Sequence, residues 1–162
     1  MATDETRSED AAAAHERYMR EALKEAEGAL ESKDRPVGAV IVHQNHVIGR
    51  AHHQVRLLRD PTAHAAIIAI TQAANALHAD QLAEASVYVT EEPCAMCAGA
   101  LLLAGVSRLI YGAANARHGA CGSVVDLTRN ERLNRRMTVY PEVLAGECYA
   151  LLRRSTAGAH LD

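Results

Sequence analysis

Apolar and polar positions along the chain follow two different periods. From about residue 8 to residue 32, apolar residues recur every three or four positions among Glu, Lys and Arg, which predicts an amphipathic helix. Shorter runs rich in Val, Ile and Tyr predict strands instead. We expect five strands, at residues 37–42, 46–50, 85–90, 107–111 and 137–140.

The segments between these strands predict helices and one tight turn. We expect three further helices, at residues 63–77, 94–104 and 141–152. Thr62 is a candidate cap for the first of them, after a polar loop at residues 52–60. Gln44 and Asn45 separate the first two strands by a tight turn, so these strands pair as a hairpin. Strands that alternate with helices are typical of an α/β sandwich with a mostly parallel sheet, and the hairpin makes the sheet mixed.

Length, charge and cysteine content narrow the class of protein. The 162 residues are the size of one domain, with residues 1–8 as a loose lead-in and residues 156–162 as a polar tail. The net charge of −3 gives no overall attraction for nucleic acid. Four Cys are too few for a secreted disulfide framework, no apolar run reaches the length of a membrane span, and the polar N-terminus lacks a signal-peptide pattern. These features predict a cytoplasmic protein without membrane contact.

Two short motifs, PTAHAA and EPCAMC, carry the candidate chemistry. They supply one imidazole, His64, and two thiols, Cys94 and Cys97, each close to the start of a predicted helix. Cys residues three positions apart lie on one helix face, and a helix N-terminus favours the thiolate form. One His and two Cys are the three protein ligands of a catalytic zinc site, which keeps a fourth position for water. The sequence therefore predicts one zinc ion held by these three residues.

Four segments of the chain resemble the tRNA adenosine deaminases, members of the cytidine deaminase-like zinc deaminases with the signature H-x-E…P-C-x-x-C. The segments keep the family's order and spacing, at residues 36–40, 60–65, 92–100 and 119–123. The resemblance implies a three-layer α/β/α sandwich with a five-stranded sheet, a homodimer, and hydrolytic deamination of a nucleobase. It also implies substrate contacts from Val37, Ala39, His53, Pro93 and Asn115. The residues by themselves leave plainer alternatives open: packing for Ala39, a polar loop for His53 and helix capping for Asn115.

The chain departs from the family signature at position 66, where the proton-shuttling Glu of the resembling enzymes is replaced by Ala66. A methyl group cannot carry a proton, and loss of a positioned acid/base costs roughly 10²–10⁴ in rate. We therefore expect this chain to bind zinc but to be essentially inactive. The substitution is consistent with a catalytic Glu exchanged for Ala to trap substrate, or with a natural non-catalytic subunit.

The substrate follows less directly from the sequence. Adenosine in a tRNA anticodon is our first hypothesis, because the motifs match the tRNA enzymes best. His53 stands where most relatives carry Asn, Asn115 stands where the tRNA enzymes usually carry an acid, and no aromatic residue follows Tyr149. These departures keep open a deaminase of guanine or a related free base or nucleoside. A zinc-binding partner subunit of another deaminase is the third hypothesis.

Overall fold

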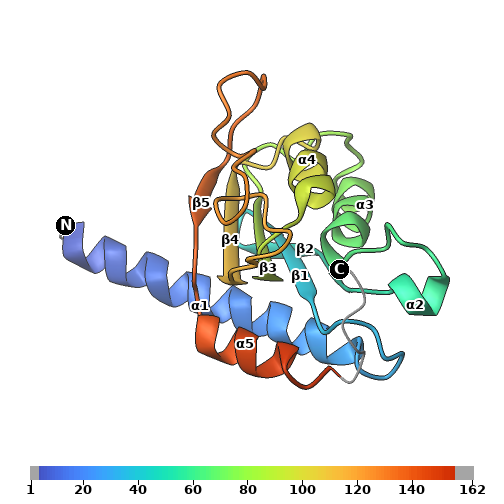
Figure 1. Ribbon diagram of the computed structural model, residues 1–162. Helices are drawn as coiled ribbons and strands as arrows, with labels where there is room; N and C mark the ends of the chain where they lie inside the picture. Colours follow the sequence, from blue (N-terminus) through green and yellow to red (C-terminus); the bar gives the residue numbers. More distant parts are fainter. Residues whose placement is uncertain (1–3, 156–162) are drawn as a thin grey trace.

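The computed structural model describes residues 4–155 and contains one five-stranded sheet (Figure 1). The strands lie in the order β2-β1-β3-β4-β5, with β1 antiparallel to both β2 and β3, and with β3, β4 and β5 parallel. The predicted mixed sheet is confirmed, although only two of its four pairings are parallel. The strands are β1 (Gly38–His43), β2 (His46–His52), β3 (Ser86–Glu91), β4 (Arg108–Ala113) and β5 (Thr138–Tyr140).

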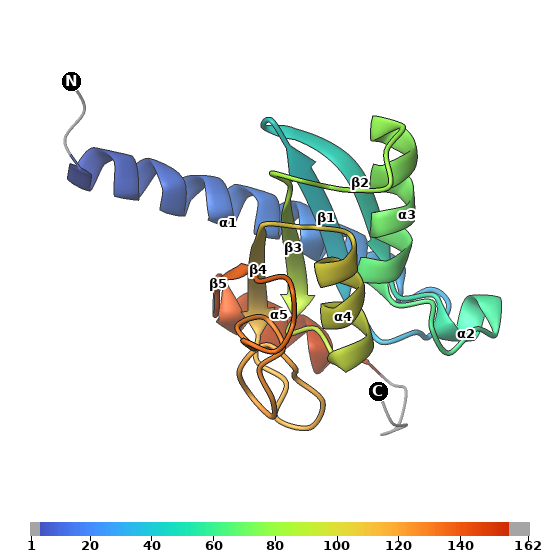
Figure 2. The ribbon, with the colours of Figure 1, turned by 90° about the horizontal axis from the view of Figure 1, so that it is seen from above.

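Helices cover both faces of the sheet, which confirms the three-layer α/β/α sandwich. Figure 1 and Figure 2 show α1 and α5 on one face, and α3 and α4 side by side on the other. A short helix, α2, lies at the edge of the second layer. The helices are α1 (Asp4–Gly28), α2 (Val55–Leu58), α3 (Ala65–Leu77), α4 (Ala95–Leu103) and α5 (Ala145–Leu152). None of these helices has both the length and the apolar character required to cross a membrane.

Strand alternation divides the core into two clusters, because successive side chains of a strand point to opposite faces. In β3, Val87 and Val89 pack on the side of α3 and α4, whereas Tyr88 packs with residues of α1. Small residues let the layers approach closely. A Cβ atom at Gly38 would lie only 2.0 Å from the carbonyl oxygen of Ala22 in α1, so no larger residue fits between helix and sheet there.

The predicted hairpin is confirmed, and its turn has a clear conformational signature. Gln44 and Asn45 both have positive φ, 48° and 63°, between the paired residues His43 and His46. Two consecutive residues with positive φ form the turn that matches the right-handed twist of a two-stranded ribbon. From this turn β2 returns along β1 until His52 pairs with Gly38, with one irregularity in the pairing between Ile41 and Val42.

Several predicted boundaries were wrong. Helix α1 begins at Asp4, inside the segment expected to be a loose lead-in, and ends at Gly28 rather than near residue 32. The last helix begins at Ala145 instead of Pro141, because Glu142 and Leu144 adopt positive φ, which interrupts a helix. Helix α2 was predicted as part of a loop. The expected polar tail, 156–162, and residues 1–3 of the lead-in lie outside the described residues.

Candidate metal centre and active site

The N-termini of α3 and α4 supply the three predicted ligands. His64 is the N-cap residue of α3, Cys94 is the N-cap residue of α4, and Cys97 lies in the first turn of α4. The predicted cap at Thr62 is wrong, because its hydroxyl donates to Asp60 and the helix begins only after His64. Each ligand is therefore placed by the chain just as it enters a helix, where the backbone N–H groups favour negative charge.

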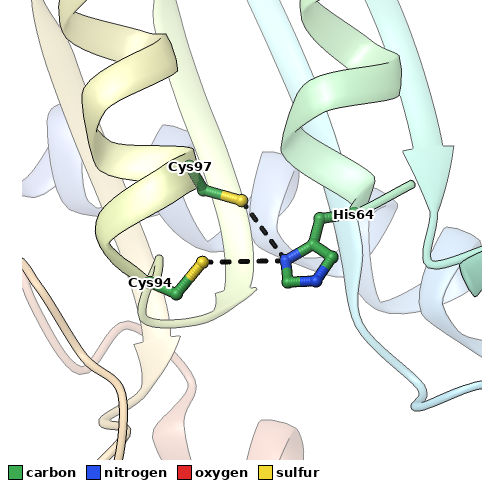
Figure 3. Close-up of side chains that lie close together, drawn as sticks. All are labelled: His64, Cys94 and Cys97. Atoms are coloured by element: carbon green, nitrogen blue, oxygen red, sulfur yellow. Dashed lines mark hydrogen bonds between the residues drawn. The ribbon is translucent and has the colours of Figure 1, made fainter. Parts of the chain in front are cut away.

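The three side chains converge on one point, with their ligand atoms within 4.8 Å of one another (Figure 3). The Nδ1 atom of His64 lies 3.7 Å from Sγ of Cys94 and 3.5 Å from Sγ of Cys97. Tetrahedral zinc with ordinary bond lengths would separate an imidazole nitrogen from a thiolate sulfur by about 3.6 Å. The residues thus fit a zinc ion in donor type, in number and in spacing.

The two thiols differ in their ionisation. A hydrogen bond from Cys97 lowers the pKa of Cys94 to about 3, against the effect of its partial burial. The same hydrogen bond, together with burial, raises the pKa of Cys97 above its usual value. Cys94 is therefore a thiolate at neutral pH, so the pair carries a negative charge that attracts a cation.

A cavity opens beside these ligands, and it brings together most of the predicted site residues. In addition to the three ligands, its lining includes the predicted residues Val37, His53, Ala66, Pro93 and Asn115. Ala39 is the exception: its side chain is fully buried in the core on the side of α3, and it is not among the lining residues. The packing alternative therefore describes Ala39 in this structure.

His53 is buried in the wall of this cavity and belongs to the environment of His64. Its Nδ1 atom accepts a hydrogen bond, 3.1 Å long, from the backbone N–H of Ala65. Burial, followed by the nearby charges of His64, Arg35 and His52, lowers the pKa of His53 well below its usual value. Because a backbone N–H can only donate, the neutral ring carries its proton on Nε2, which can donate to a ligand.

Asn115 lines the cavity, and its side chain also shapes its own loop. Its Oδ1 atom accepts hydrogen bonds from the backbone N–H groups of Arg117 and His118, at 3.1 Å and 3.0 Å. The amide oxygen therefore caps a turn at residues 115–118, and the helix-capping alternative is wrong, because none of the described helices begins here. The two roles are compatible, because an Asn amide also has two N–H donors.

The sequence prediction missed four lining residues, three of which are charged: Arg35, Val89, Glu91 and Glu92. Glu91 pairs with Arg35. The Glu92 carboxylate accepts hydrogen bonds from the backbone N–H groups of Asn115, Cys121 and Ser123, each 3.0 Å long, and from the hydroxyl of Ser123. The sequence feature that could have indicated Glu91 and Glu92 is the presence of two consecutive acidic residues at the end of a buried strand, directly before the Cys motif.

Comparison with known proteins places this site in a family. Residues 13–145 match the family model of the MafB19-like deaminases. The chain is 40% identical, over 137 residues covering 85% of each protein, to the tRNA-specific adenosine deaminase of Bacillus subtilis.

Solved structures agree with the sequence relatives. One, from work on A-to-I editing by tRNA:A34 deaminases at the wobble position of transfer RNA, is similar with a TM-score of 0.80 and 38% identity, over 83% of this chain and 98% of the other. Guanine deaminase from Nitrosomonas europaea is similar with a TM-score of 0.73 and 27% identity, over 88% and 84%. The chain therefore belongs to the MafB19-like deaminase family, and it is also similar to tRNA-specific adenosine deaminases.

Proposed function

We propose that the chain is built for zinc-dependent hydrolytic deamination of adenosine in a tRNA anticodon. The observation that carries this proposal is the convergence of His64, Cys94 and Cys97 at zinc spacing beside a cavity whose wall contains His53 and Asn115. The substrate is inferred from the relatives of the chain, which include tRNA-specific adenosine deaminases at about 40% identity.

The chain's own residues would divide the work of the site. His64, Cys94 and Cys97 would hold zinc, which in such sites acts as a Lewis acid and lowers the pKa of a bound water to about 7. His53 would donate from Nε2 to an acceptor nitrogen of the base, and Val37 and Pro93 would pack against its ring. Asn115 would contribute its amide N–H groups.

Position 66 lacks the group that would move protons between water and base. Ala66 lies in the first turn of α3 and lines the cavity with a methyl group. The two carboxylates in the cavity wall are already engaged, Glu91 with Arg35 and Glu92 with the loop at 115–123. Because a proton shuttle needs a carboxylate that can turn between partners, we infer that this chain binds its substrate without converting it.

Restoring the carboxylate tests this function. We expect Ala66→Glu to deaminate the wobble adenosine of an anticodon stem-loop RNA at least about 10²-fold faster than the unchanged chain, with inosine and ammonia as products. Ala66→Gln is the matched control, since it adds similar bulk without an acid. If zinc-loaded Ala66→Glu protein forms neither inosine from RNA nor xanthine from guanine, the proposed activity is refuted.

A guanine deaminase is the second candidate, and the likeness to the Nitrosomonas europaea enzyme favours it. The same Ala66→Glu protein separates the two, because a guanine deaminase would release ammonia from the free base and leave the stem-loop unchanged. Co-purification with a Glu-bearing deaminase would instead support a non-catalytic partner subunit. A homodimer and a cytoplasmic location remain predictions.

A further inference from the structure

An ion pair joins two segments that are 56 positions apart in the sequence, directly at the cavity. Nε of Arg35 donates to Oε2 of Glu91 at 2.8 Å, and Nη2 donates to Oε1 at 2.5 Å. Arg35 precedes β1, and Glu91 is the last residue of β3. The Glu91 side chain is 8% exposed and that of Arg35 is 32% exposed. The pair thus reaches from a buried carboxylate to a partly exposed guanidinium.

Strand alternation places this pair on the face of the sheet that carries the metal ligands. Val87, Val89 and Glu91 are alternate residues of β3 and share one face, and Val37 lies in the same core cluster as the two valines. Val37 and Val89 line the cavity together with Arg35 and Glu91. Two charged side chains therefore lie beside the aliphatic side chains of Val37 and Val89 in this wall.

Stability alone does not account for a charged pair at this place. Removing the Glu91 carboxylate from water is costly, and apolar residues of similar volume commonly support a fold as well as or better than a buried ion pair. The flanking Val37 and Val89 show that aliphatic side chains fit this wall. A role toward a ligand does account for the pair, because a polar substrate needs a polar group at a defined position.

The hydrogen bonds of the wall residues leave Glu91 with free acceptor sites. A carboxylate has about four acceptor sites, and Arg35 takes one on each oxygen of Glu91. The Glu92 carboxylate is occupied by the loop that follows β4, and the amide oxygen of Asn115 accepts from Arg117 and His118. His53 offers a donor. Among the lining side chains described here, Glu91 is the carboxylate with acceptor sites left over.

We propose that Glu91, oriented by Arg35, is a specificity-determining residue that accepts a hydrogen bond from an N–H or O–H group of the bound nucleotide. This inference rests on the proposed function. The donor has two possible sources, a ribose hydroxyl of the target nucleotide or an amino group of its base. Arg35 is a positioning residue in this arrangement, because its two parallel N–H donors hold the carboxylate plane in one orientation.

The test compares the zinc-loaded chain with the double variant Arg35→Met/Glu91→Leu, which keeps the volume of the pair and removes its hydrogen bonds. Three RNA hairpins serve as probes. They are identical except for one loop nucleotide, which is adenosine, 2′-deoxyadenosine or 2,6-diaminopurine riboside. Dissociation constants can be measured directly, because Ala66 leaves the RNA unconverted. Arg20→Met/Glu16→Leu is the matched control, since it removes an exposed ion pair of α1, on the other face of the sheet.

We expect the unchanged chain and the control variant to bind the hairpin that carries the donor group about tenfold more tightly than the hairpin that lacks it. In the double variant that preference should fall to less than twofold, while the donor-free hairpin binds as before. Loss of the adenosine over deoxyadenosine preference identifies the ribose hydroxyl as donor. Loss of a diaminopurine over adenosine preference identifies the amino group.

Two outcomes refute the inference, and they are distinguishable. If the unchanged chain binds the hairpins and both preference ratios are the same in the double variant, Glu91 does not select the substrate and the proposed function stands. If the unchanged chain binds none of the hairpins, the RNA substrate itself is refuted. Should the double variant lose its zinc or fail to fold, Glu91→Gln is tested instead, because its side chain retains one acceptor oxygen. We expect the ratio of the two dissociation constants to fall at least threefold in this variant. An unchanged preference in Glu91→Gln then refutes the inference.

Discussion

The imidazole of His53 stacks on that of His64, with ring centroids 4.4 Å apart and ring planes inclined by 27°. The contact has a structural cause. His64 is the N-cap of α3 but makes no side-chain capping hydrogen bond, and the N–H of Ala65 donates instead to Nδ1 of His53. The backbone N–H of His53 in turn donates to the carbonyl of Val37. His53 therefore links the residue directly before β1 to the start of α3.

We predict that His53→Asn retains this function and that His53→Ala loses it. An Asn side chain can accept from Ala65 through its oxygen and donate into the cavity through its nitrogen. His53→Ala leaves a helix N–H without its acceptor, so its free energy of unfolding should fall by about 1 kcal/mol and its RNA affinity by about tenfold. Urea unfolding and RNA titration measure both effects.

His52→Ala is the control for these variants, because the ring of His52 lies beside Gly28 of α1 on the opposite side of the sheet. It should leave RNA affinity unchanged. Equal RNA affinities for His53→Ala and the unchanged chain would show that His53 contributes nothing to substrate binding.

Cation binding should stabilise the fold through the three ligands. Since the three side chains come from the starts of two separate helices, a bound ion links α3 to α4. A free zinc concentration of 100 times the dissociation constant adds about 2.7 kcal/mol to the free energy of unfolding. We expect one zinc per chain by elemental analysis, and a melting temperature that falls on addition of a chelator.

Cys97→Ala should abolish both the bound zinc and the effect of the chelator. Cys148→Ala is the matched control: its thiol is also buried, but it packs against Gly112 on the side of α1. A zinc content near one in Cys97→Ala would contradict the assignment of the ligands.

Glu92 should contribute more to the free energy of unfolding than an exposed acidic residue does. Its buried carboxylate accepts hydrogen bonds from three backbone N–H groups and one hydroxyl. Gln at this position would place an amide N–H₂ group, itself a donor, against some of these donors. We predict that Glu92→Gln lowers the free energy of unfolding by about 2–3 kcal/mol, measured by urea denaturation. Glu31→Gln, at an exposed position, should change it by less than about 0.5 kcal/mol. A loss below 1 kcal/mol in Glu92→Gln would mean that the loop does not depend on this carboxylate.

Local patterns in the sequence were sufficient to predict most of the elements and to identify the candidate metal ligands. The aliphatic runs of β1 and β3 and the turn at Gln44 and Asn45 are signals carried by neighbouring residues, so strands and hairpin could be predicted. The Cys94-x-x-Cys97 spacing places both thiols on one helix turn, and one His with two Cys is the ligand set expected of a catalytic zinc site. These predictions needed no knowledge of distant contacts.

Tertiary structure alone decided the remaining features of the site. The N-cap position of α3, at His64 rather than Thr62, depends on His53, and the start of α5 depends on residues with positive φ. Arg35 meets Glu91 only because β1 and β3 are neighbours in the sheet. Buried polar groups must find partners, and which partner is within reach depends on how segments far apart in sequence pack together. For that reason the charged wall of the cavity could not be predicted from spacing, whereas the convergence of His64, Cys94 and Cys97 could.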